Sequence, residues 1–121
     1  MFIVLVCFLF ACEKAEKPLY DQVMDIHDEV MPKMNDLYKL KKQLRDSIAN
    51  TSDMPEERKV EFGQTILLLD STSTFMMVWM REFNPPDQKD KEAFQKYMAS
   101  ELVKVKKMRE DVMRALEKTQ K

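Results

Sequence analysis

Apolar residues recur every three or four positions along three long stretches of the chain, which is the period of an amphipathic α-helix. The stretches cover residues 19–50, 55–83 and 88–119. They are separated by the turn- and cap-forming run 50–53 and by Pro85 and Pro86. Three helices of about 30 residues joined by short turns run antiparallel to their chain neighbours. The pattern therefore predicts an all-α fold, an antiparallel three-helix bundle over residues 18–121.

Three polar or proline positions refine this prediction. Pro32 has no N–H to donate to the carbonyl of Asp28, so we expect the first helix to kink just after His27. Ser73 lies on the apolar stripe of the second helix, where a small residue leaves room for that kink and its hydroxyl can bond to its own helix. Asp87 is expected to cap the start of the third helix.

The amino terminus has a different character from the rest of the chain. Residues 1–11 are uninterrupted apolar residues, too few to span a bilayer, which takes about 20 in a helix, but typical of a secretory signal. Leu9 to Cys12 resemble the lipobox of bacterial lipoproteins, in which the signal is cut before the cysteine and that cysteine carries the lipid. We therefore expect a cleavable lipoprotein signal peptide over 1–11, lipidation of Cys12 and a tether over 12–17. The alternative is that the apolar run is a buried strand or helix of the fold.

This start implies a location and a partner. A lipidated Cys12 places the protein in the bacterial cell envelope, anchored to the outer or inner membrane, where a second envelope protein is a possible partner. Basic and acidic residues nearly cancel, 20 against 21, and are interspersed, so no basic field for nucleic acid is present. The chain has one histidine, one glycine and, after processing, no free thiol. It therefore lacks the residues for an activated nucleophile with its base and for a glycine-rich phosphate-binding loop, and we expect no enzyme activity.

Register places the histidine among methionines. If the first hairpin turns near residue 52, positions whose numbers add to about 105 lie side by side, so His27 faces Val78. Thioether and imidazole ligands suit Cu(I), or Ag(I) in its place. The candidate metal ligands are His27, Met31, Met76 and Met80, with Met24, Met34 and Met77 in reserve. The alternative, which we favour, needs no cofactor: methionines fill irregular space beside a kinked helix.

Two motifs carry a family resemblance. The run His-Asp-Glu-Val-Met-Pro-Lys-Met at 27–34, followed by Leu37, Leu40 and Leu44, and Met-Met-Val-Trp-Met at 76–80, resemble small bacterial lipoproteins often labelled "viral A-type inclusion protein". The resemblance covers most of the chain after Cys12 and implies no mechanism. Arg81 stands where the family often has a histidine. The resemblance therefore implies that this chain lacks a second imidazole ligand, which favours a packing or partner role for the segment over a metal site.

A partner surface is predicted on the second helix. Phe75, Trp79 and Phe83 are spaced four residues apart and therefore share one face. If the other helices leave that face open, it forms an apolar patch of the kind that marks interaction sites. The sequence thus predicts a membrane-anchored, non-enzymatic binding module, with Cu(I) or Ag(I) binding as the alternative.

Overall fold

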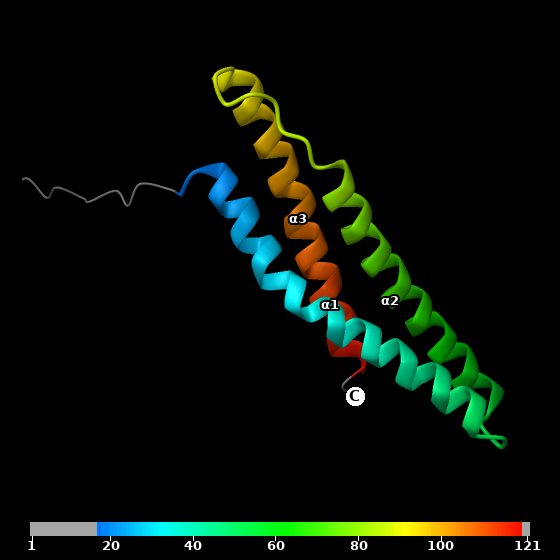
Figure 1. Ribbon diagram of the computed structural model, residues 1–121. Coiled ribbons are helices and arrows are strands. Elements are labelled where there is room, and N and C mark those ends of the chain that lie inside the picture. The colour runs from blue at the N-terminus through cyan, green and yellow to red at the C-terminus, as the bar shows by residue number, and fades with distance from the viewer. Residues whose placement is uncertain (1–16, 120–121) are drawn as a thin grey trace, which may run out of the picture.

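The computed structural model describes residues 17–119, which form three helices. The helices are α1 (Leu19–Asn50), α2 (Glu56–Glu82) and α3 (Lys91–Thr119). Each helix packs against the other two, and α2 runs antiparallel to both of its chain neighbours (Figure 1). The predicted all-α three-helix bundle is confirmed. The predicted signal peptide, Cys12 and the tether up to residue 16 lie outside the described residues, as do residues 120 and 121.

Proline and acidic residues define where the first two helices begin. Pro18 and Pro55 each occupy the position just before a helix, and their carbonyls accept the first intrahelical bonds, from Gln22 and Lys59, both at 3.1 Å. A missing N–H has no cost at such a position, because the first amides of a helix have no partner within the helix. Glu56 and Glu57 occupy the first turn of α2, where negative charge is favoured.

The start of α3 differs from the prediction. Asp90, and not Asp87, caps the helix: its Oδ1 accepts the N–H of Ala93 at 3.2 Å. Asp87 lies one turn earlier, where its carboxylate accepts the N–H of Lys89 at 2.9 Å and its carbonyl accepts the N–H of Asp90 at 3.0 Å. An aspartate at either place would satisfy the sequence pattern, because both turns and caps favour this residue.

The buried core occupies one part of the bundle. Its largest fully buried side chains are Val23, Val30, Leu37, Leu69, Met76, Met98, Val105 and Val112. No residue from 38 to 68 is buried, so the paired ends of α1 and α2 form an arm that we call the distal arm. Figure 1 shows this arm, with the turn between α1 and α2 at its tip, extending past the red end of α3. The distal arm is therefore a two-helix hairpin with a half-exposed seam.

An ion-pair cluster joins the two helices where the core ends. Lys41 of α1 donates to Asp70 of α2 at 2.6 Å, and Arg45 lies 3.6 Å from the same carboxylate. The hydrogen bond from Lys41, helped by both positive charges, holds the pKa of Asp70 below its usual range. This cluster ties the distal arm together at the edge of the core.

Pro32 lies inside α1, which continues through it as a single helix (Figure 1), and the predicted kink after His27 stays a prediction. The hydroxyl of Ser73 donates to the carbonyl of Leu69 at 2.8 Å, so the predicted bond to its own helix is confirmed.

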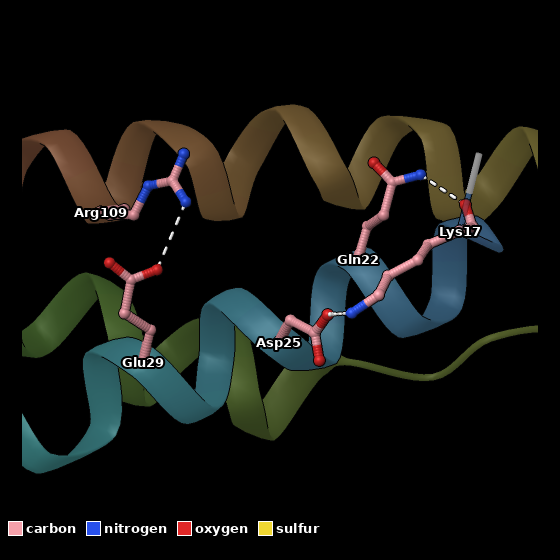
Figure 2. A network of polar contacts seen from close by, with 5 residues as sticks. All are labelled: Lys17, Gln22, Asp25, Glu29 and Arg109. Atoms are coloured by element: carbon pink, nitrogen blue, oxygen red, sulfur yellow. Dashed lines mark hydrogen bonds and ion pairs between the residues drawn. The ribbon is translucent and has the colours of Figure 1, made fainter. Parts of the chain in front are cut away.

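Polar contacts also fix the start of α1 and its pairing with α3 (Figure 2). Lys17 forms an ion pair with Asp25 at 2.8 Å, and its carbonyl accepts a hydrogen bond from Gln22 at 2.6 Å. Arg109 of α3 reaches Glu29 of α1 at 3.4 Å. These contacts are exposed, and such pairs contribute at most about 1 kcal/mol each, so they set geometry more than stability.

Between residues 17 and 119, no helix has the length and apolar character needed to cross a membrane.

Candidate functional site around Trp79

Trp79 contacts both of the other helices from its place on α2. The residue is 6% exposed, and its indole N–H donates to Oε2 of Glu101 on α3 at 2.5 Å. On the α1 side, the ring centroid of His27 lies 6.0 Å away, and along α2 the ring of Phe83 lies 5.1 Å away. Tyr97 of α3 extends the aromatic cluster, 6.0 Å from Phe83. Trp79 therefore separates two candidate sites, one on each side of α2.

On the α1 side, His27 meets the methionine segment of α2 as the register predicted. Its Nε2 lies 3.3 Å from Sδ of Met80, and its Nδ1 lies 3.1 Å from Oδ1 of Asp28. The residue numbers 27 and 80 add to 107, close to the expected value of about 105. An imidazole nitrogen and a thioether sulfur thus face each other across the α1–α2 seam.

The other predicted metal ligands occupy different environments. Met76 is fully buried in the core, Met31 and Met34 are half-buried against it, and Met24 is half-buried on α1. Met77, in contrast, is 58% exposed, and its role as a ligand stays a prediction. Its position one residue after Met76 turns it about 100° away from the core side of α2. Within residues 17–119, no group of three or more His, Cys, Asp or Glu side chains is placed to hold a metal ion.

On the α3 side, the predicted aromatic row is divided between surface and core. Phe75 is 43% exposed, Phe83 is half-buried and Trp79 is buried. Trp79 is not in the exposed part of the row, because it is buried and Glu101 accepts its N–H, and the use of the row as a partner surface stays a prediction. Phe75 remains the exposed member of the row.

Two pockets between α2 and α3 meet at Phe75, and together we call them the α2–α3 groove. One pocket of about 310 Å³ is lined by Phe75, Val78, Trp79, Glu82, Tyr97, Glu101 and Lys104. A second pocket, of about 260 Å³, shares Phe75 and is lined further by Leu68, Ser71, Thr72, Lys107 and Asp111. The groove thus has an apolar middle and charged residues on its α3 rim, which is the pattern of many binding surfaces.

A buried carboxylate lies in the first pocket. Glu101 is 4% exposed and is bonded on both oxygens, to the indole of Trp79 and to Nζ of Lys104 at 3.0 Å. The hydrogen bond and the negative charge of Glu101 raise the pKa of Lys104 above its usual value. Sequence reasoning missed Glu101. The available signal was its place between Met98 and Val105 at three- and four-residue spacing, where an apolar residue is expected.

Comparison with known proteins found no similar protein. No protein-family model, no curated protein and no solved structure matches the chain. Functional inference therefore depends on the residues around Trp79 and on the sequence of the amino terminus.

Proposed function

We propose that this protein is a lipid-anchored lipoprotein of the bacterial cell envelope that binds a partner protein, without catalysis, through the α2–α3 groove. The exposed aromatic side chain of Phe75, 43% accessible where two pockets meet, is the observation that carries the binding role. The lipobox-like run from Leu9 to Cys12 supports the anchor. Both parts are separately testable.

Replacing Cys12 with serine tests the anchor. Wild-type protein is expected in the membrane fraction, with the mass of a processed, acylated chain, whereas the Cys12→Ser variant loses the acyl mass and leaves that fraction. Acyl chains contribute about 0.8 kcal/mol per buried methylene, so their loss removes stable membrane attachment. Cys7→Ser is the matched control and leaves both readouts unchanged. A Cys12→Ser variant with unchanged mass and membrane association refutes the anchor.

In this proposal, the groove lies near the membrane. Trp79 packs beside His27, which is eight residues beyond Leu19 in α1, or about 12 Å along the helix. A tether of residues 12–17 spans at most about 20 Å. A partner bound at this level is therefore within reach of the membrane surface, as expected for another envelope protein.

Site-specific crosslinking tests the binding surface. A photoreactive phenylalanine analogue at position 75 is expected to yield a discrete protein adduct in intact cells. The control is the same analogue at position 77, because Met77 is exposed on α2 outside the α2–α3 groove. Discrete adducts at 75 and none at 77 support the groove. Equal labelling at both positions, or none at 75, refutes it.

A second candidate function is Cu(I) or Ag(I) binding at the α1–α2 seam. The observation that favours it is the 3.3 Å separation of His27 Nε2 and Met80 Sδ. With metal–ligand distances of about 2.0 and 2.3 Å, two donors at that separation subtend an angle of about 100° at a shared ion, which is compatible with joint coordination. The half-buried residues Met24, Met31 and Met34 on α1 offer further soft sulfur donors in the same segment.

A Cu(I) competition titration tests this candidate. His27→Ala and Met80→Leu are each expected to weaken binding at least about 10-fold, because each removes a ligand. Met113→Leu, an exposed methionine on α3, is the control and is expected to bind as the wild type does. Equal affinities in all four proteins refute a site at the seam.

A further inference from the structure

The pocket at Trp79 already contains an internal cation. Nζ of Lys104 lies 3.0 Å from Oε1 of Glu101, and the lysine side chain is 52% exposed whereas that of the glutamate is 6% exposed. The carboxylate is thus a fixed part of the pocket, held on its other oxygen by Trp79. The ammonium group reaches it from the solvent side and is free to swing away, since a flexible lysine side chain on a helix surface has several accessible rotamers.

The remaining pocket wall also favours a cation. Phe75, Trp79 and Tyr97 line the pocket with aromatic rings, whose faces attract positive charge. Glu82 and Glu101 carry two negative charges against the single positive charge of Lys104, so the lining has a net charge of −1. A volume of about 310 Å³ is near the lower limit of small-molecule sites, and it suits one side chain or a small amine.

We propose that this pocket binds one basic side chain of the partner, an arginine or lysine, with Glu101 as its counter-ion and Lys104 as the internal cation that it displaces. The inference rests on the proposed binding function and specifies the chemistry of the partner. A guanidinium group binds better than an ammonium group here, because it donates to the oxygen that Lys104 leaves and its flat face also stacks on aromatic rings.

The single tryptophan of the chain makes the pocket directly observable. Trp79 fluorescence is followed while propylguanidinium, butylammonium or butyrate is added to the purified protein. The expected result is a saturable change with propylguanidinium, a weaker response with butylammonium and none with butyrate. No saturable change with either cation, or an equal response to butyrate, overturns the proposal.

Two substitutions with opposite expected effects separate binding from mere structural damage. Glu101→Gln keeps an acceptor for the indole N–H but removes the charge, and it is expected to weaken propylguanidinium binding at least about 10-fold. Lys104→Met removes the competing cation and is expected to tighten binding several-fold. Lys106→Met, at an exposed position of α3 outside the pocket lining, is the control and leaves the affinity unchanged. Weaker binding in Lys104→Met overturns the displacement model, even where Glu101→Gln fails to fold.

A short peptide distinguishes the source of the cation. A peptide with one central arginine is expected to bind more tightly than propylguanidinium, and its alanine counterpart not to bind. A peptide that binds no more tightly than the free cation overturns assignment to a partner side chain. If these titrations fail but crosslinking at position 75 succeeds, the cation pocket is refuted and the proposed function stands. If the crosslink at position 75 is absent, the proposed function itself is refuted.

Discussion

Glu101→Ala tests how much the buried carboxylate contributes to holding α3 against α2. In the wild type, Glu101 accepts the N–H of Trp79 at 2.5 Å, and both residues are more than nine-tenths buried. Alanine removes the acceptor and leaves the indole N–H without its partner, at a cost of about 1–3 kcal/mol. It also removes a packed methylene, worth about 0.8 kcal/mol.

Two effects reduce this cost. Trp79 and Glu101 line the same open pocket, so water can reach the indole N–H once the carboxylate is gone, which favours the lower end of the range. Removing a buried charge also recovers its desolvation free energy. The expected loss in free energy of unfolding is therefore about 2 kcal/mol.

Urea denaturation followed by circular dichroism provides the measurement, since the fluorescence of Trp79 is itself perturbed. The control is Glu110→Ala, at an exposed position of the same helix, with an expected change below about 0.5 kcal/mol. A double-mutant cycle with Trp79→Phe isolates the shared hydrogen bond, and a coupling energy of about 1–2 kcal/mol is expected. A Glu101→Ala loss equal to that of Glu110→Ala, or a coupling energy near zero, refutes the reasoning.

Three further substitutions probe the rest of the fold. Leu37→Ala empties a fully buried position and should cost about 2–5 kcal/mol in a urea titration, whereas Leu67→Ala, at a residue 68% exposed, should stay within about 0.5 kcal/mol. Asp90→Ala removes the cap of α3 and should lower the melting temperature by the equivalent of about 1 kcal/mol; an unchanged melting temperature contradicts that role. Because Lys41 lowers the pKa of Asp70, the stabilisation from this carboxylate is present above its unfolded pKa of about 3.9 and disappears as pH falls through the folded pKa. The carboxylate is 40% exposed, so Asp70→Asn should cost only about 0.5 kcal/mol at pH 7 and nothing near pH 2; a cost independent of pH contradicts this assignment.

The helices and their pairing were predictable because each rests on local chemistry. The prolines and acidic residues at residues 18, 55–57 and 85–87 mark helix boundaries, and apolar spacing marks the buried faces. A turn near residue 52 then determines which positions of the first two helices face each other, and the contact of His27 with Met80 agrees with that register.

Positions that depend on the third helix were less predictable. Periodicity places Phe75, Trp79 and Phe83 on one face of α2 but does not say how far α3 covers that face. Coverage depends on the crossing of α2 and α3, which is set by packing of side chains distant in sequence. Glu101 was missed for the same reason: a charged residue at an apolar position becomes informative only when its buried partner is known.

The position of Trp79 allows the two candidate ligands to be distinguished with one signal. His27 and Met80 lie on the α1 side of the ring, and Glu101 and Lys104 lie on its α3 side. A soft metal at the seam therefore changes the fluorescence in a way that His27→Ala abolishes and Glu101→Gln leaves intact. An organic cation in the pocket shows the opposite dependence on the same two substitutions. Because the indole ring of Trp79 lies between the two sites, binding at one should change the affinity at the other only through movement of that ring.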